Sequence, residues 1–161
     1  MRLPRGLLLL LLMLLGLVVP AFAQVEKVAI RTTGISCGTC AAVSEIYLRR
    51  LAGIERIKIS LSKEAVMVSY KPGAAFQPKD LRDALQKTDV GVLQFQISAR
   101  GRVQDQGGTR FFVAGRDRFV LAAASDAPQV PVNTPVLIEA MLDDRADPME
   151  LKVMTVKPLK P

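Results

Sequence analysis

Cys37 and Cys40 are the only two cysteines of the 161-residue chain, and two residues separate them. Cysteine thiolates are soft ligands that select Cu(I), Hg(II) or Cd(II), and they hold Zn(II) when further ligands join them. A pair this close cannot close a long loop, so its use is local: a metal site, a redox pair or a short disulfide. The chain has no histidine, and it therefore lacks the commonest general base and the commonest nitrogen ligand.

The segment that holds the pair, Gly34-Ile35-Ser36-Cys37-Gly38-Thr39-Cys40, is predicted to be a loop that runs into a helix. Gly34 and Gly38 permit the tight backbone that turns both sulfurs toward one ion. A helix N-terminus offers unpaired N–H groups and a partial positive charge, which favour thiolate over thiol. We expect this effect to be stronger at Cys40 than at Cys37.

The apolar pattern on both sides of this loop predicts the elements that must position it. Alternating apolar residues predict strands, and apolar residues at helical spacing predict helices. The strands are expected at 25–32, 54–61, 65–70 and 92–97, and the helices at 39–51 and 78–87. The order strand, helix, strand, strand, helix, strand predicts a ferredoxin-like βαββαβ domain, an antiparallel sheet with both helices on one face.

The second half of the chain reads differently, because it has no long helical period. Short strands separated by turn-forming segments are expected at 97–104, 110–113, 118–123, 136–141 and 151–156. This pattern favours a small all-β barrel of the oligonucleotide/oligosaccharide-binding (OB) type. The predicted fold class is therefore α+β, with a ferredoxin-like domain at 24–98 and an OB-like barrel at 99–161, joined without a flexible linker.

The first residues have the features of a secretory signal peptide. Arg2 and Arg5 precede an apolar run at 7–19, and Ala21-Phe22-Ala23 fits a small-x-small cleavage site. We expect residues 1–23 to be removed, so that the mature chain begins at Gln24. The predicted location is periplasmic or secreted.

Residues 25–97 resemble the heavy-metal-associated domain family of copper chaperones, metal-transporting P-type ATPases and the periplasmic mercury-binding protein. The stretches that carry the resemblance are the Gly34-to-Cys40 loop, Leu51-Ala52-Gly53-Ile54-Glu55-Arg56-Ile57, Ile59-Ser60-Leu61, 65–70 and 81–85. The resemblance implies that Cys37 and Cys40 are the metal ligands, for Cu(I) first and for Hg(II) or Zn(II) next. It also implies transfer to a metal-transporting or metal-accepting partner protein, which can be membrane-bound.

The chain departs from the family pattern at two places beside the cysteines. Ile35 replaces the usual methionine, and as an apolar residue we expect it to plug the core beneath the loop. Thr88-Asp89-Val90 stands where the family often has an aromatic residue or a lysine beside the metal. If Asp89 approaches the thiolates, it would either repel their charge or offer an oxygen ligand.

Two other uses of the cysteine pair stay open. A CxxC at a helix start is also typical of thioredoxin-like redox proteins, although Ser36 replaces the aromatic residue usual there. In an oxidising compartment the pair can also close as an inert disulfide. The leading hypothesis is metal binding, and the redox protein is the alternative.

Other candidate functions have weaker support. Four methionines outside the leader could offer thioether ligands, but they form no cluster in the sequence, and we expect them to pack: Met67, Met141, Met149 and Met154. The net charge of +7 is spread along the chain, so no nucleic-acid partner is predicted. Serines without a histidine form no catalytic constellation. We therefore predict neither an enzyme nor a small-molecule substrate.

Overall fold

The computed structural model describes residues 23–159. The predicted signal peptide lies outside the described residues, except for Ala23 at its end. Within the described part of the chain, no helix combines the length and apolar character that a membrane crossing requires.

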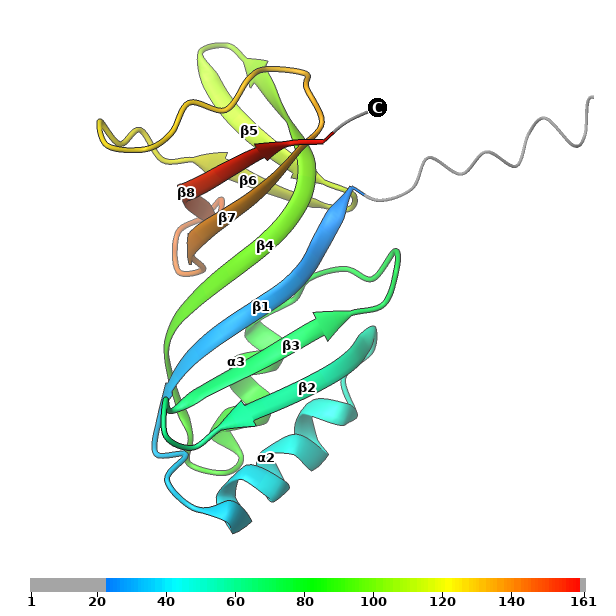
Figure 1. Cartoon of the computed structure of the whole chain (residues 1–161), viewed down its shortest axis with the longest axis vertical. Helices are drawn as coiled ribbons and strands as arrows, with labels where there is room; N and C mark the ends of the chain where they lie inside the picture. The colour runs from blue at the N-terminus through cyan, green and yellow to red at the C-terminus, as the bar shows by residue number, and fades with distance from the viewer. Residues whose placement is uncertain (1–22, 160–161) are drawn as a thin grey trace, which may run out of the picture.

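The first half folds in the predicted order around a sheet with strand order β2-β3-β1-β4, in which all neighbours are antiparallel. Both helices cover one face of this sheet (Figure 1). The βαββαβ order expected from the apolar pattern is confirmed. The elements are β1 (Gln24–Thr33), α2 (Gly38–Arg49), β2 (Ile54–Ser60), β3 (Ala65–Tyr70), α3 (Pro78–Gln86) and β4 (Gly91–Gln106).

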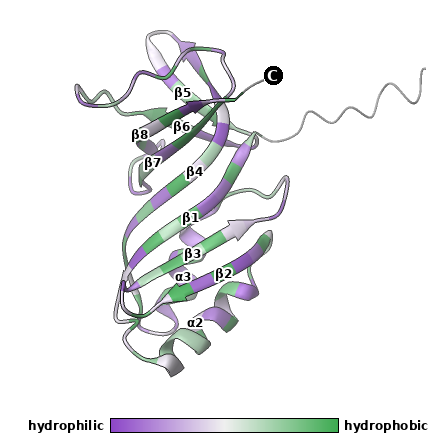
Figure 2. Cartoon of the chain, viewed as in Figure 1, coloured by the Kyte–Doolittle hydropathy of each residue, from purple (hydrophilic) through white to green (hydrophobic). Residues whose placement is uncertain are grey.

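Alternation along the strands gives this sheet one apolar face and one open face. Val28 and Ile30 of β1, and Val66 and Val68 of β3, are fully buried beneath the helices. Successive strand residues point to opposite faces, so the residues between them face away from the helices. Figure 2 shows the resulting alternation of polar and apolar residues along β1, β3 and β4. We call this second surface the helix-free face.

Strand β4 belongs to both halves of the molecule. The strands expected at 92–97 and 97–104 form this one continuous strand, so the predicted boundary between 98 and 99 falls inside β4. Buried residues continue along it from Phe95 to Val103. At Gly101 a Cβ would lie 2.2 Å from the carbonyl oxygen of Val113 and 2.8 Å from the ring of Phe112. Glycine is therefore required where β4 enters the second half.

The second half contains β5 (Thr109–Ala114), β6 (Asp117–Leu121), β7 (Val136–Asp143) and β8 (Glu150–Pro158). Together with the end of β4 they form a ring, because β4 pairs with both β5 and β7. The remaining neighbours are β5–β6 and β7–β8, which are antiparallel, and β6–β8, which is parallel. Large apolar side chains fill the inside of the ring, among them Phe112, Phe119, Ile138 and Leu151.

The two halves share one hydrophobic core, with Phe76 at their junction. The ring of Phe76 lies 6.1 Å from Tyr70 and 6.3 Å from Phe95 in the first half, and 6.4 Å from Phe119 in the second, between centroids. Both carboxylate oxygens of Asp117 accept the Phe76 N–H at 3.1 Å. The β3–α3 loop is therefore fixed to the second half.

A second polar contact, made by α3 itself, also joins the halves. The Arg82 guanidinium donates two hydrogen bonds to the Asp144 carboxylate, at 2.5 and 2.8 Å. It donates a third to the carbonyl oxygen of Val92 at 3.0 Å. Bidentate arginine–carboxylate pairs fix orientation as well as distance. Helix α3 is thus held against both β4 and the β7–β8 connection.

Candidate metal-binding site

The cysteine loop is anchored from below by Ile35. Its side chain is fully buried, as the sequence predicted for the residue that replaces methionine. Gly34 has a φ of +92°, and a Cβ there would lie 3.0 Å from the carbonyl oxygen of Asp89. Only glycine adopts this backbone without strain. The loop therefore lies directly against the connection between α3 and β4.

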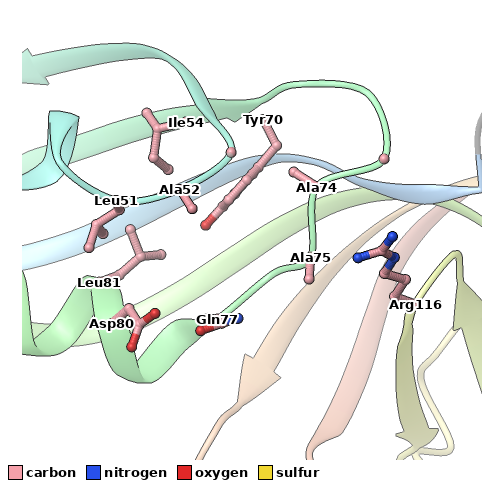
Figure 3. Close-up of a pocket in the computed structure, with 12 residues that line it drawn as sticks. Leu51, Ala52, Ile54, Tyr70, Ala74, Ala75, Gln77, Asp80, Leu81 and Arg116 are labelled. Atoms are coloured by element: carbon pink, nitrogen blue, oxygen red, sulfur yellow. The ribbon is translucent and has the colours of Figure 1, made fainter.

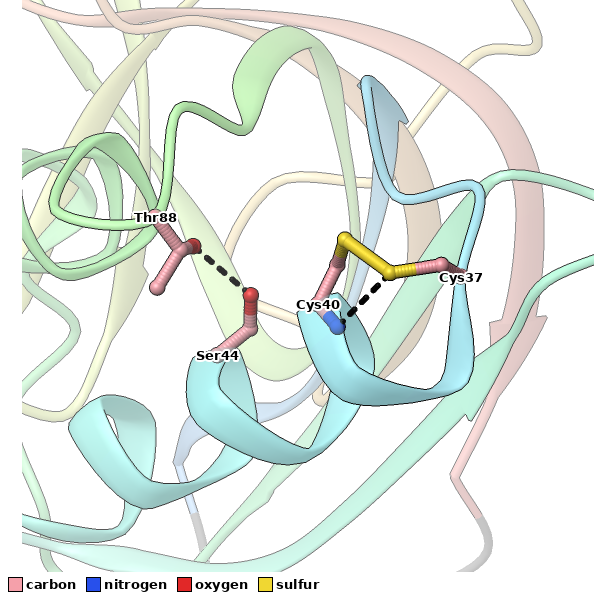
Figure 4. The surroundings of a disulfide bond; sticks show 4 residues. All are labelled: Cys37, Cys40, Ser44 and Thr88. Carbon is pink, nitrogen blue, oxygen red and sulfur yellow. Dashed lines mark hydrogen bonds between the residues drawn. A yellow bond between two sulfur atoms is a disulfide. The ribbon is translucent and has the colours of Figure 1, made fainter.

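Cys37 is the N-cap of α2. Its backbone is extended, with φ −133° and ψ 153°, and its Sγ accepts the N–H of Cys40 at 3.0 Å (Figure 4). An N-cap acceptor satisfies one of the helix's free donors and lies at the positive end of its dipole. From the sequence we expected the helix N-terminus to stabilise the thiolate of Cys40 more than that of Cys37. The geometry instead gives the helix N–H to the sulfur of Cys37, because α2 begins at Gly38.

The two cysteines form a disulfide, and their Cα atoms lie 5.2 Å apart. Both sulfurs therefore lie at the same helix start, and reduction would release two thiols that are already neighbours. The Cys37 side chain is exposed, whereas Cys40 is half-buried. An approaching group thus reaches the pair from the side of Cys37.

A hydrogen-bonded pair of hydroxyls lies one helical turn beyond Cys40. Ser44 is fully buried, and its Oγ is 2.8 Å from Oγ1 of Thr88. The Thr88 hydroxyl donates to the carbonyl oxygen of Leu85 at 2.8 Å, so the shared proton comes from Ser44. This contact ties α2 to the loop before β4 (Figure 4). No structural role was predicted for Ser44 from the sequence, although its spacing of four from Cys40 was a signal that it lies near the site.

The oxygen-ligand alternative for Asp89 has no support in the geometry. Asp89 is exposed, with a left-handed φ of +57°. Within residues 23–159, no three His, Cys, Asp or Glu side chains are grouped so that they could hold a metal ion. The described residues thus offer an incoming ion two sulfurs at this place, which suits the low coordination number of Cu(I) better than that of Zn(II).

A separate hollow of about 300 Å³ lies beside the junction, and its walls include Tyr70, Asp80, Leu81 and Arg116 (Figure 3). Burial, with the charges of Asp117 and Asp80, raises the pKa of Tyr70 above its ordinary value. Burial also raises the pKa of Asp117 to about 6, although the N–H of Phe76 opposes this shift. The described lining residues include no sulfur ligand, so we assign no metal to this hollow.

Comparison with known proteins finds relatives for half of the chain. No family model matches the chain. A stretch of 80 residues, 50% of the chain, is 41% identical to copper-transporting ATPase 2 of Mus musculus and 39% identical to that of Rattus norvegicus. The resemblance to the heavy-metal-associated family is confirmed. The match spans 5% of the length of these ATPases.

Two solved structures are also similar to part of the chain. The CopZ metallochaperone shares 22% identity over 42% of this chain and 100% of its own, with a TM-score of 0.39. The yeast copper transporter domain Ccc2a shares 21% identity over 42% of this chain and 94% of its own, with a TM-score of 0.37.

Proposed function

We propose that the chain binds a soft metal ion, Cu(I) first, between the thiolates of Cys37 and Cys40 and transfers it to an acceptor protein. The observation that carries this proposal is the position of the pair: two neighbouring sulfurs at a helix N-terminus, with Cys37 capping the helix and open to solvent. Hg(II) is the next candidate, and Zn(II) would need ligands from elsewhere.

Binding begins from the reduced pair. A dithiol reductant supplies two electrons and two protons, and it leaves as a disulfide. The ion then displaces both thiol protons, because the thiolate is the ligand. The Cys40 N–H that points at Cys37 Sγ at 3.0 Å favours the anion at that sulfur. The site is therefore prepared for the charged form before the ion arrives.

Transfer follows from the shallow placement of the pair. An acceptor thiolate adds to the bound ion from the open side, and one of the two cysteines then leaves. The exposed Cys37 is the sulfur that the acceptor reaches first, while the half-buried Cys40 stays in place longer. The acceptor would be a metal-transporting or metal-accepting protein, which can lie in a membrane.

We further propose that the second half is an OB-like barrel that docks the acceptor, and that the chain acts outside the cytoplasm. The strand ring β4-β5-β6-β8-β7 with its parallel β6–β8 pair supports the barrel type. The continuous strand β4 joins it to the cysteine half, so an acceptor bound to the barrel would stay close to the cysteines, which supports a docking role. Adding the metal-binding domain of a copper-transporting ATPase should shift amide signals of β5–β8 as well as those of α2; shifts confined to α2 would remove this role.

The main experiment is anaerobic Cu(I) titration of the fully reduced protein against a chromophoric Cu(I) chelator. We expect the cysteine pair to hold one Cu(I) tightly enough to compete with the chelator. We expect Cys37→Ser and Cys40→Ser each to weaken this binding by more than the about 10–100-fold typical of losing an outer-sphere partner. Ser36→Ala in the same loop is the matched control and should bind as the wild type does. Equal affinities in all four proteins would refute the proposal.

Thiol–disulfide exchange is the second candidate function, and the Cys37–Cys40 disulfide is the observation that favours it. In that reaction a substrate thiolate attacks one sulfur, the disulfide opens, and the other cysteine leaves as a thiolate. Measuring the reduction potential together with the metal content of freshly reduced protein separates the two. A redox protein would exchange disulfides rapidly and bind no Cu(I) in preference to the chelator.

A further inference from the structure

A hollow of about 210 Å³ on the helix-free face is lined by two methionines of the neighbouring strands β7 and β8. It lies where the sheet of the first half meets strands β7 and β8. Its lining includes two polar but uncharged residues of β4, Gln94 and Gln96, and a small residue of β1, Ala29. The lining residues are Ala29, Arg31, Gln94, Gln96, Met141 and Met154.

Strand register explains why Met141 faces this hollow. Gln96 of β4 lies between Ala29 of β1 and Met141 of β7, as the partner of both. Residues paired across strands point to the same face of a sheet. The inward neighbours of Met141, Ala140 and Leu142, are buried inside the strand ring. The thioether of Met141 therefore lies on the outside, on the same face as Gln96 and Ala29.

Met154 of β8 faces the same outer side as Met141, because it alternates with the inward Val153. In β8, Val153 pairs with Ala140 and Thr155 pairs with Glu139, so Met154 is the extra residue between them. Val153 is buried in the ring, whereas Met154 is 39% exposed. Because Met154 is exposed, its side chain does not contribute to the hydrophobic core.

We propose that Met141 and Met154 form a second soft-metal site, which binds Cu(I) or Ag(I) through its two thioether sulfurs. Thioethers are soft, uncharged ligands that suit these ions and not Mg²⁺ or Ca²⁺. The site carries no formal charge from its ligands. Three charged residues lie near it: Arg31 lines the hollow, Lys152 is the cross-strand partner of Met141, and Glu139 pairs with the residue after the bulge.

This site differs from the cysteine pair in what it requires. A thioether has no proton to lose and cannot close into a disulfide, so the methionine pair binds its ion whatever the oxidation state of Cys37 and Cys40. The inference does not rest on the proposed function, since the two sites share no residue. It gives the chain a place to hold a soft ion while the disulfide is closed.

The test uses the double variant Cys37→Ser/Cys40→Ser titrated with Ag(I), which is redox-inert, and with methionine methyl groups labelled with ¹³C. Binding should shift the methyl signals of Met141 and Met154 together and leave those of Met67 and Met149 in place. In this background Met141→Leu and Met154→Leu should each weaken Ag(I) binding by about tenfold or more, because one of two sulfur ligands is lost.

Met67→Leu is the matched control. Met67 lies on the same helix-free face, pairs with Ala29 and is 45% exposed, but it does not line the hollow. Leucine conserves side-chain volume, so all three variants should keep their stability. Unchanged binding in Met141→Leu and Met154→Leu, or equal weakening by Met67→Leu, would overturn the proposal. Loss of Cu(I) binding at the cysteines alone would leave it intact.

Discussion

The two sulfur sites of this protein are built in opposite ways. The cysteine pair lies within one short segment of the first half, and a single helix start positions both sulfurs. The methionine hollow needs β1 and β4 on one side and β7 and β8 on the other. The first site therefore depends on local backbone geometry, whereas the second depends on how the halves pack. Variants that disturb the packing should separate them.

Phe76→Ala should have the largest effect, because Phe76 joins the cores of both halves. Removing a fully packed phenylalanine side chain costs about 3–5 kcal/mol of unfolding free energy, which denaturant unfolding followed by circular dichroism would measure. Where the variant remains folded, Ag(I) binding at the methionines should weaken more than Cu(I) binding at the cysteines.

Phe111→Ala is the control for this variant, since Phe111 is half-buried beneath Arg118 and away from the junction. It should cost less stability than Phe76→Ala and leave both metal sites unchanged. If Phe76→Ala weakened the two sites equally, the distinction between a local and an assembled site would be wrong.

A decrease in pH should have the next largest effect, because it should lower the metal affinity of the cysteine site and leave that of the methionine site unchanged. Protons compete with metal for thiolates, so below the thiol pKa the Cu(I) affinity of the cysteine pair should fall by about tenfold per pH unit for each proton displaced. Thioethers bind no proton in this range, and Ag(I) affinity in Cys37→Ser/Cys40→Ser should stay constant from about pH 8 to pH 5. Chelator competition at several pH values measures both. A parallel decline would contradict the assignment of thioether ligands.

The contribution of the junction to folding stability should depend on pH with the opposite sign: acid lowers metal affinity at the cysteines but strengthens this contribution. Burial raises the pKa of Asp117 from its ordinary 3.8 to about 6, so between these values the folded state binds more protons than the unfolded state. The contribution of Asp117 to stability is therefore greatest in acid and falls as the pH rises to about 6. An asparagine side chain at this position cannot ionise, and it would remove this dependence.

Asp117→Asn should thus gain stability relative to the wild type as the pH increases from about 4 to 7, in paired denaturant titrations. Asp105→Asn, at the exposed end of β4 and away from the junction, removes the same charge and is the matched control. A constant difference between Asp117→Asn and the wild type would exclude this role for the carboxyl.

Ser44→Ala should have the smallest effect, confined to the cysteine site. It removes a hydroxyl that donates to Thr88, at a cost of about 1 kcal/mol, while Thr88 keeps its bond to Leu85. The loop beside the cysteines loosens, and Cu(I) affinity should fall by up to about tenfold, as for outer-sphere partners. Ser62→Ala, in an exposed turn, should change neither quantity. An effect of Ser44→Ala on Ag(I) binding at the methionines would show that the sites are coupled.

Periodicity was enough to predict the elements of the first half, because each of its strands and helices buries one face. The strand at 65–70 has the predicted bounds, and Ile35 is buried where the apolar pattern placed it. The pattern could not show that 92–97 and 97–104 form one strand. Their continuity depends on Gly101, where the backbone of Val113 comes too close for any side chain.

The proposed cysteine site could be located from the sequence alone, since the ligand types, their spacing and the glycine before them are local properties. The structure was needed to show which sulfur caps the helix, because the exact start of α2 at Gly38 leaves no clear signal in the residue pattern. The structure was also needed for Met141 and Met154, which form no cluster along the chain. Strand pairing puts them on one face, and such pairing leaves no periodic signal in the order of residues.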